Sequence, residues 1–523
     1  FGMYESIRQY ASEQLIRDPA MKQVHGRYRE HYLKMGSELV RQLGGKGGAD
    51  ALNRLSAEVD NLLEVQRLAL HLDAKQIVQA ALVLDPVLYM RGPHDTHREV
   101  LDQAVAMADE VEPLVHARLL KARGGARRGR GEVEGAQADF EQALSIASEH
   151  EDAGLQTVLL GNLGGLAQER GWMAEAERRF SEAWVLAEEA QIARLLGYVD
   201  TLQGQLFQHL GRLEDAQQHY RDALVITRRE ADHLYEGIVL RHLGNLFRER
   251  GRFEQAMERS TEALKLFREI GDRRHESVVL SNMGCIKLEQ RQISSAVQHF
   301  EQALDVHREV GDRRNAGIVL TNLGSLYVDE RRLDAAEEVY REALQCAHSV
   351  SDRRLEGIIM GNMGCLDFAK DELEDAESHF RNSVLRLAEV GSRRFEGYFL
   401  AWLGAVLAAM SRVRDAKESL VHAEGRLRGV DDPSGMALLD VCKGFLELAR
   451  GHEGARGGAS VHEVRRHFHA ANECVTRATE PMAGRRPTGE HPRAAVELSS
   501  DVRLAVHLLE EHIENEPTIS HRH

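Results

Sequence analysis

Apolar residues along the middle of the chain recur with the spacing of amphipathic helices. One representative segment has two apolar stripes, formed by Leu320, Leu323, Leu326 and Tyr327, and then by Leu333, Ala336, Val339, Tyr340, Ala343 and Leu344. Spacings of three and four residues put side chains on one face of an α-helix, whereas a strand would show alternation. The polar stretch 329–332 separates the two stripes. The pattern therefore predicts a hairpin of two helices.

The same helical pair recurs every forty residues, and glycine is its most regular mark. The central glycines are Gly164, Gly204, Gly244, Gly284, Gly324, Gly364 and Gly404, and the phase extends to Gly124 and Gly444. An alanine follows each central glycine after twelve residues, and an aromatic residue follows most of them after sixteen. Because a glycine within a helix costs about 1 kcal/mol relative to alanine, we expect two helices to approach too closely there for a side chain. We expect the alanine to supply the matching small surface and the aromatic ring to fill the space between successive hairpins.

Short breaks between the units carry helix-capping residues. Gly271-Asp272 and Gly311-Asp312 are two examples. Glycine ends a helix in the left-handed conformation, and aspartate begins the next helix as its N-cap. The chain is therefore predicted to be all-α, a stack of antiparallel helix hairpins.

The repeated pattern resembles the tetratricopeptide repeat, which is usually about 34 residues long. The residues that carry the resemblance in one unit are Asn322, Leu323, Gly324, Tyr327, Ala336, Tyr340 and Ala343. The forty-residue unit is similar to the long variant of kinesin light chains and many bacterial signalling proteins. The resemblance implies a right-handed α-solenoid over residues 115–478, with a concave surface that binds proteins or peptides. The outer units depart from the pattern, with Arg- and Gly-rich sequence at 124–129 and an insertion at 451–460.

Residues 1–75 contain helical stretches outside this phase, at 4–11, 25–33 and 52–62. Their order is similar to the junction in STAND-type regulatory ATPases and LuxR-like transcription regulators. There a nucleotide-binding domain and a winged helix precede a tetratricopeptide sensor array. The resemblance implies that residues 1–75 are a helical remnant of the winged-helix or linker region, with an ATPase domain upstream. The chain starts at Phe1, so we interpret it as a fragment or a processed product.

The remaining segments complete the predicted domain organisation. We expect a degenerate capping hairpin at 76–114, a linker at 479–497, a terminal helix at 498–515 and a disordered tail at 516–523. The linker contains several prolines, which interrupt helices. The terminal helix either docks back on the array or leads into a further domain.

Composition narrows the functional classes. The chain has 523 residues, with 67 Lys and Arg against 83 Asp and Glu, so its formal net charge is −16. This acidic balance argues against direct nucleic-acid binding by this segment. No apolar run approaches the roughly 18 residues of a membrane span, so no membrane partner is expected. Five cysteines without a CxxC pair favour reduced thiols and a cytoplasmic location.

Motifs for chemistry are weak. The glycine–lysine cluster at 44–48 lacks the spacing of a P-loop, which favours a flexible loop. His467 and His469 lie near Cys474, but no HExxH motif occurs, and solvated surface histidines are the favoured interpretation. We therefore expect no catalytic residue, no cofactor and no metal site.

A row of polar residues stands two positions before the central glycines. It consists of Asn162, Asn282, Asn322 and Asn362, with His242 in the same place. The resemblance places this row on the concave groove, where an asparagine ladder holds an extended peptide backbone. Asn donates to and accepts from one peptide unit. The alternative is that each Asn braces the neighbouring hairpin. Four residues earlier, a varied row would select side chains: Tyr198, Ile238, Val278, Ile318, Ile358 and Tyr398.

Two groups of basic residues accompany this row. Arg241, Asn245 and Arg248 form a basic face in one unit, and the resemblance implies that they clamp a carboxylate. A solvated face or an internal salt bridge is the interpretation that we favour. Paired arginines also mark the starts of first helices as a basic edge: Arg273, Arg274, Arg313, Arg314, Arg353, Arg354, Arg393 and Arg394. These either attract an acidic partner or, as we favour, pair with Glu269, Glu309, Glu389 and neighbouring acids.

These observations predict a non-catalytic scaffold that holds a protein or peptide in its concave groove. We expect it to be the sensor arm of a signal-transduction ATPase or transcription regulator, in contact with upstream ATPase or winged-helix domains. A free-standing, kinesin-light-chain-like adaptor is the alternative, and an enzyme is the least favoured class.

Overall fold

The computed structural model of the chain is helical throughout its described residues, among which no strand occurs. These residues are 19–43, 47–70, 73–108, 111–428 and 433–457, with short stretches at 462–463, 465–467, 469–471, 473–474, 504 and 506–509. The predicted linker and tail lie outside them, as do residues 1–18. The all-α prediction is thereby confirmed.

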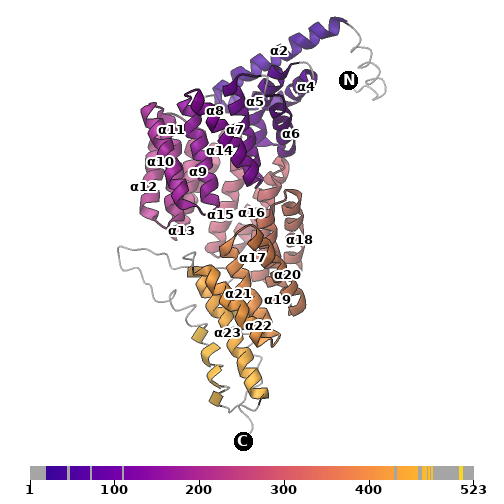
Figure 1. Ribbon diagram of the computed structural model, residues 1–523, viewed down its shortest axis with the longest axis vertical. Coiled ribbons are helices and arrows are strands. Elements are labelled where there is room, and N and C mark those ends of the chain that lie inside the picture. The colour runs from indigo at the N-terminus through magenta and orange to yellow at the C-terminus, as the bar shows by residue number, and fades with distance from the viewer. Residues whose placement is uncertain are drawn as a thin grey trace. The chain divides into compact units, whose positions relative to one another are not determined.

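The helices follow one another in pairs along most of the chain (Figure 1). Before the repeats come α2 (Pro19–Gln42), α3 (Gly48–Ala57), α4 (Val59–Ala69), α5 (Ala74–Arg91) and α6 (His94–Val105). The repeats contain α7 (Pro113–Gly129), α8 (Val133–Glu149), α9 (Ala153–Glu169), α10 (Met173–Glu189), α11 (Ala193–His209), α12 (Leu213–Arg229), α13 (His233–Glu249), α14 (Phe253–Ile270), α15 (Arg273–Glu289), α16 (Ile293–Val310), α17 (Arg313–Asp329), α18 (Leu333–Ser349), α19 (Arg353–Ala369), α20 (Leu373–Glu389), α21 (Arg393–Ala409), α22 (Val413–Leu427) and α23 (Pro433–Arg456).

The chain divides into two compact units. Unit 1 comprises the described residues of Phe1–Arg248, Arg252–Ile286 and Asp305–Asp312. Unit 2 comprises those of Glu249–Gly251, Lys287–Leu304 and Arg313–His523. Within each unit, the first helix of a hairpin packs against the second, as α9 does with α10 and α19 with α20. The fold is therefore an α-solenoid of consecutive helix hairpins.

The central glycines lie under the aromatic rings of their own hairpins. A Cβ atom on Gly164 would stand 2.4 Å from the ring of Phe180, and one on Gly324 would stand 2.4 Å from the ring of Tyr340. Both rings are fully or almost fully buried. Phe180 also shares a buried cluster with Leu206 of the next hairpin. The ring therefore fills the space between hairpins, as predicted, and in addition occupies the place that a side chain on the glycine would need.

Capping follows the predicted chemistry at several breaks. Gly271 ends α14 with a left-handed backbone, at a φ of 79°. The Asp272 carboxylate accepts a hydrogen bond from the backbone N–H of His275 at 3.0 Å. Asp352 does the same for Leu355 at 2.9 Å. Each of these contacts satisfies a backbone donor that the helix start would leave unpaired.

The helices before the repeats form a core that continues into the first hairpin. Leu52, Leu62 and Leu84 are fully buried in this core, and Leu119 of α7 belongs to the same cluster. Helices α5 and α6 occupy the segment predicted as a capping hairpin. The first repeat helix is thus covered by apolar packing on the side where no preceding repeat exists.

The array ends differently from the sequence-based expectation in one respect. Helix α23 continues to Arg456, so the predicted insertion at 451–460 begins as a helical extension. Leu509 lies over Gly444, where a Cβ atom would stand 2.5 Å from its Cδ2 atom. Leu508 and Leu509 are buried. The described residues of the predicted terminal helix, 504 and 506–509, therefore pack on α23.

Two adjacent glycines of α7 test whether the aromatic ring over a central glycine excludes a side chain there. We expect Gly124→Ala to lower the free energy of unfolding by about 1–3 kcal/mol, because its Cβ atom would stand 2.6 Å from the buried Phe140 ring. Gly125→Ala is the matched control in the same helix, since nothing lies within 4 Å of its Cβ position. It should stabilise the chain by about 0.5–1 kcal/mol. Denaturant titration measures both, and equal effects would contradict the close approach.

Candidate functional site

The predicted polar row lies on the first helices, on the face turned away from their hairpin partners. Asn162 is on α9, His242 on α13 and Asn282 on α15, all in unit 1. Asn322 on α17 and Asn362 on α19 belong to unit 2. Two residues correspond to about 200° around a helix, so each residue lies opposite the glycine that faces the second helix. We call this face, in each unit, the first-helix surface.

The asparagine amides of the row have no protein partners in the described part of the chain. All four Asn side chains are half-buried. None of them takes part in a side-chain hydrogen bond among the described residues, and Nδ2 of Asn282 is buried without an acceptor. A buried amide donor without a partner costs about 1–3 kcal/mol. The predicted bracing by side-chain hydrogen bonds is therefore not seen for these four amides among the described residues.

Apolar residues take the same position in two other repeats. Leu202 stands there on α11, and Trp402 stands there on α21. Trp402 is fully buried, with its ring stacked on Phe380 at a centroid distance of 6.2 Å and edge-on to Phe368 at 6.0 Å. In unit 2 the row of asparagines therefore stops at Asn362, a limit that the sequence analysis missed although the forty-residue register contains it.

His242 is held as a neutral ring. Nη2 of Arg241 donates to Nε2 of His242 at 2.7 Å, and the imidazole stacks on the Tyr220 ring at 5.6 Å. Burial, and after it the charge of Arg241, lowers the pKa of His242 well below its usual range. A neutral imidazole is what can accept the hydrogen bond from Arg241.

Arg241 is a cation without a counter-charge. Its Nε atom is buried without a partner, and within the described residues no carboxylate pairs with it. Burial lowers the pKa of its guanidinium. Asn245 and Arg248 lie four and seven residues further along α13, on the same face. Arg241 therefore does not form the predicted internal salt bridge.

Aromatic residues line the first-helix surface of unit 1. The hydroxyl of Tyr198 stands 2.6 Å from the place of a Cβ atom on Gly161. Its ring meets Tyr235 edge-on at 5.8 Å, and the Arg194 guanidinium lies over the Tyr235 ring at 5.6 Å. Burial raises the pKa of Tyr235 to about 12. Tyr235 was not among the predicted site residues, although Phe395 occupies the same position of a later repeat.

The basic edge is largely used within the fold. Arg273 pairs with Glu276 at 2.6 Å and with Glu309, Arg314 pairs with Asp352 at 2.7 Å, and Arg353 pairs with Glu389 at 3.3 Å. Arg274 lies over the Tyr89 ring at 4.3 Å, while Arg354 and Arg394 lie over Phe395 at 5.6 and 5.9 Å. Arg313 and Arg393 form no ion pair among the described residues. Glu269 contacts Lys265 at 3.8 Å rather than an edge arginine.

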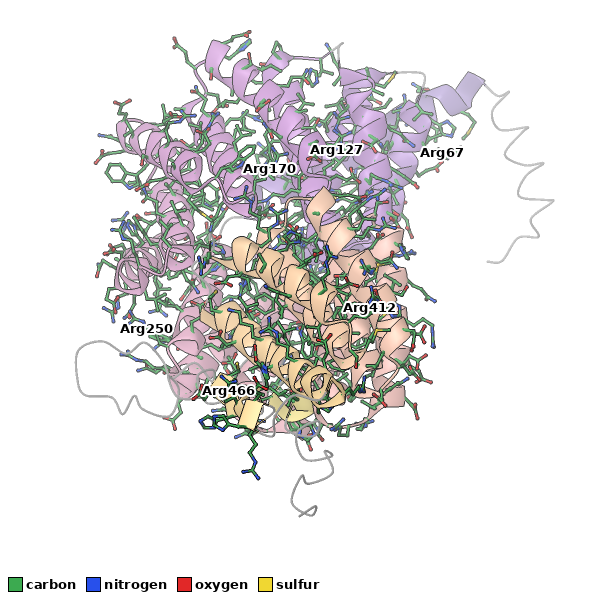
Figure 2. All side chains as sticks on the ribbon, turned by 60° about the horizontal axis from the view of Figure 1, so that its bottom comes forward. Arg67, Arg127, Arg170, Arg250, Arg412 and Arg466 are labelled. Atoms are coloured by element: carbon green, nitrogen blue, oxygen red, sulfur yellow. The ribbon has the colours of Figure 1, made fainter. Side chains whose placement is uncertain are left out.

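Three of the arginines labelled in Figure 2, which lie outside the predicted sets, are also paired with acids. Arg127 pairs with the buried Asp139 at 2.9 Å, and Arg170 pairs with Glu134 of the preceding hairpin at 3.1 Å. Arg412 pairs with Glu377 at 2.7 Å. Against this background, the lack of a carboxylate at Arg241 stands out.

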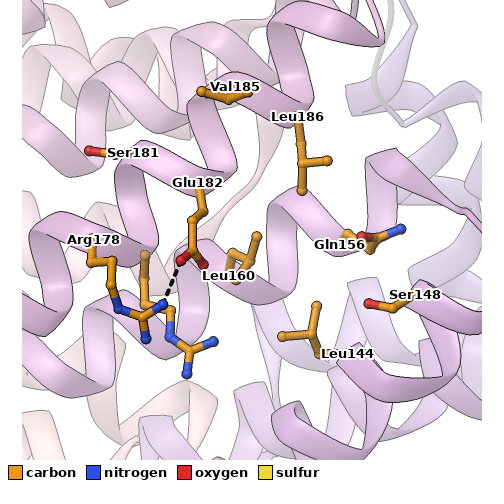
Figure 3. Close-up of a pocket in the computed structure, with 10 residues that line it drawn as sticks. Leu144, Ser148, Gln156, Leu160, Arg178, Ser181, Glu182, Val185 and Leu186 are labelled. Atoms are coloured by element: carbon orange, nitrogen blue, oxygen red, sulfur yellow. Dashed lines mark hydrogen bonds and ion pairs between the residues drawn. The ribbon is translucent and has the colours of Figure 1, made fainter.

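A groove of about 660 Å³ lies elsewhere in unit 1, between α8, α9 and α10 (Figure 3). Its lining is mainly apolar, with Leu144, Leu160 and Leu186, and Arg178 donates to Glu182 at 2.5 Å beside it. None of the predicted site residues lines it. No group of metal-binding side chains occurs among the described residues. No helix in the described part of the chain is long and apolar enough to cross a membrane.

Three segments match models of the tetratricopeptide repeat: residues 192–269, 278–310 and 319–345. The chain therefore carries an array of tetratricopeptide repeats, as the sequence predicted. No curated protein matches the chain in sequence.

Three of the solved structures that match the chain are as follows. One is a signal transduction ATPase with numerous domains and a tetratricopeptide repeat sensor, from Pyrococcus horikoshii. It has 13% identity and a TM-score of 0.50, and the match covers 80% of this chain and 70% of that one. A Rap protein complexed with competence and sporulation factor has 13% identity, a TM-score of 0.46 and coverage of 75% and 99%. The apo quorum sensor NprR from B. thuringiensis has 15% identity, a TM-score of 0.42 and coverage of 68% and 99%. At such identities the likeness to the ATPase shows the fold.

The neutral His242 predicts a pH dependence of stability. The pKa of His242 in the folded chain lies below the unfolded value of about 6.5. The stability that the neutral imidazole contributes is therefore complete above that pH and is lost as the pH falls. Between pH 7.5 and 5.5 we expect a loss of about 1 kcal/mol that His242→Asn removes. Urea titration at both pH values measures it. The control is His422→Asn, at an exposed position on α22, which should leave this loss of stability unchanged. If His242→Asn also left it unchanged, the imidazole of His242 would already be protonated in the folded chain.

Proposed function

We propose that this chain is a non-catalytic scaffold that binds an extended peptide segment along its first-helix surfaces. The observation that carries the proposal is the row of asparagine amides without protein partners, one of which is buried. An amide can donate to and accept from the same peptide unit. Amides that recur once per hairpin can therefore hold an extended backbone without regard to its sequence.

Charge and aromatic residues add selectivity to this surface in unit 1. Arg241 has no carboxylate partner within the described residues, so an acidic side chain or terminal carboxylate of the ligand would supply its counter-charge. Tyr198 and Tyr235, whose rings meet edge-on, supply apolar contact area in the same unit. The preferred ligand is therefore an extended peptide with an acidic group and an apolar or aromatic residue.

A role as the sensor arm of a signal-transduction ATPase or transcription regulator extends this proposal. The solenoid fold is shared with the sensor of the Pyrococcus horikoshii ATPase, and stacked repeats form long concave surfaces suited to ligand detection. The cysteines, all present as free thiols, fit a reducing cytoplasm. Sequencing the gene upstream of Phe1 tests this extension, since a P-loop followed by a winged helix would support it and an unrelated upstream region would contradict it.

The asparagines are testable in unit 2 with a peptide selected on the intact chain from an array of synthetic peptides. Asn322→Ala together with Asn362→Ala removes two amides, each of which contributes about 0.5–1.5 kcal/mol to binding. We expect the dissociation constant to rise roughly 5- to 150-fold, measured by calorimetry. Asn382→Ala, at an exposed position of α20, is the control that should bind normally. Unchanged affinity in the double variant with an intact fold would refute the ladder.

Arg241 predicts a preference for acidic ligands. Arg241→Gln should weaken binding of peptides with an acidic residue about 10-fold or more, since charge-assisted hydrogen bonds are worth about 1.5–3 kcal/mol. Peptides in which that residue is replaced by its amide should bind wild type and variant equally. Fluorescence anisotropy with the four combinations measures the coupling. An equal loss for both peptides would show that Arg241 supports the fold and not the ligand.

A further inference from the structure

The groove between α8, α9 and α10 has a counterpart two repeats later, between α12, α13 and α14. Positions eighty residues apart are equivalent in the array, because the unit is forty residues long. Three equivalent pairs decide what fills the two grooves: Ser148 and Arg228, Gln156 and Glu236, and Glu182 and Glu262. All of these residues belong to unit 1. The later repeat therefore shows what occupies this place when an arginine is present.

In the later repeat, the arginine on α12 lies across the groove. Nε of Arg228 donates to Oε1 of Glu236 on α13 at 2.8 Å, and its Nη2 atom lies 3.5 Å from Oε2 of Glu262 on α14. Oε1 of Glu262 is bound from its own helix, by Arg259 at 2.8 Å. One guanidinium thereby joins three helices. The position is basic in two further repeats, where its ion pairs are Arg268–Glu276 at 2.8 Å and His348–Glu356 at 3.5 Å.

In the earlier repeat, the acceptors are present without the arginine. Oε1 of Glu182 accepts from Arg178 of its own helix at 2.5 Å, and Oε2 has no partner among the described residues. Nε2 of Gln156 donates to the backbone carbonyl of Ala147 at 3.2 Å, and its Oε1 atom meets no donor in the same part of the chain. Ser148 bonds to neither acceptor. The two oxygens that correspond to those around Arg228 are therefore open.

The groove has the shape and lining that an arginine side chain needs. Its volume of about 660 Å³ exceeds one side chain and falls within the range of ligand-binding pockets. In Figure 3, Leu160 lies between Glu182 on one wall and Gln156 on the other, with Leu144 beside it. A guanidinium is weakly hydrated, so its stem and flat faces pack on apolar surface while its edge donates to oxygen atoms.

The charges at the rim permit a further cation. Arg178 and Arg179 both pair with Glu175, at 2.7 and 2.8 Å, and Arg178 also pairs with Glu182. These four side chains carry no net charge together, so no uncompensated positive charge faces the groove from α10. The chain as a whole has a formal net charge of −16, which attracts basic partners.

We propose that this groove binds an arginine side chain of another protein, which takes the place that Arg228 fills two repeats later. The guanidinium donates to Oε2 of Glu182 and Oε1 of Gln156. Its stem, and an apolar neighbour in the ligand, pack on Leu144 and Leu160. None of the asparagines of the first-helix surface lines the groove, so this site does not rest on the proposed peptide-binding function.

Two tripeptides test the site on the intact chain: acetyl-Leu-Arg-Leu-amide and its citrulline counterpart, which has nearly the same shape and no charge. In titrations followed by NMR saturation transfer, the arginine peptide should bind about three- to fivefold more tightly, as expected for an exposed ion pair. Ser148→Arg places the missing side chain in the groove and should remove this preference. The control is Ser145→Arg, which adds the same charge at an exposed position of α8 outside the groove and should keep it.

A second variant tests the carboxylate directly. Glu182→Gln keeps the size of the side chain and removes its charge, so it should bind the two tripeptides equally. Equal binding of both tripeptides to the wild-type chain would overturn the proposal, and so would a preference that survives in Ser148→Arg or in Glu182→Gln. The double variant Asn322→Ala and Asn362→Ala should bind the tripeptides like wild type. Failure of the arginine site therefore leaves the proposed peptide-binding function standing, and the reverse also holds.

Discussion

The structure depends on the contact between a glycine in each first helix and the bulky side chain sixteen residues later. In most repeats this side chain is an aromatic ring, which needs the space that a Cβ atom would take. The same ring reaches the next hairpin, as Phe180 reaches Leu206. One small residue thus fixes the packing within a hairpin and the packing between hairpins. Its recurrence every forty residues is what keeps successive hairpins in register.

The opposite face of the first helix packs on the preceding hairpin in some repeats, where His242 stacks on Tyr220 and Trp402 stacks on Phe380. Two residues before the glycine, the side chains of Asn162 and Asn322 cannot reach the second helix, and they meet no protein acceptor among the described residues. The edge arginines show the contrast, since Arg273 and Arg353 tie the two helices of their own hairpins together, and Arg314 pairs with Asp352 at the start of the next hairpin.

The fold and the polar row could be predicted from sequence because both are periodic. Helical spacing, capping residues and the glycine phase each repeat many times, so every unit supports the same assignment. Contacts that occur once are different. The bond from Arg91 to Gly271 joins residues 180 positions apart, and nothing in the local pattern of either residue indicates it. The fate of Arg274 and the aromatic partner Tyr235 were missed for the same reason.

The docking of Leu509 over Gly444 has a consequence for how such a chain can change in length. Inside the array, duplication or deletion of a forty-residue block restores every glycine–ring contact, so repeat number can drift with little harm. The last hairpin lacks that freedom, because its cover comes from a segment more than sixty residues downstream. A chain truncated before that segment would bare the apolar side of α23 to solvent, with self-association as the expected outcome.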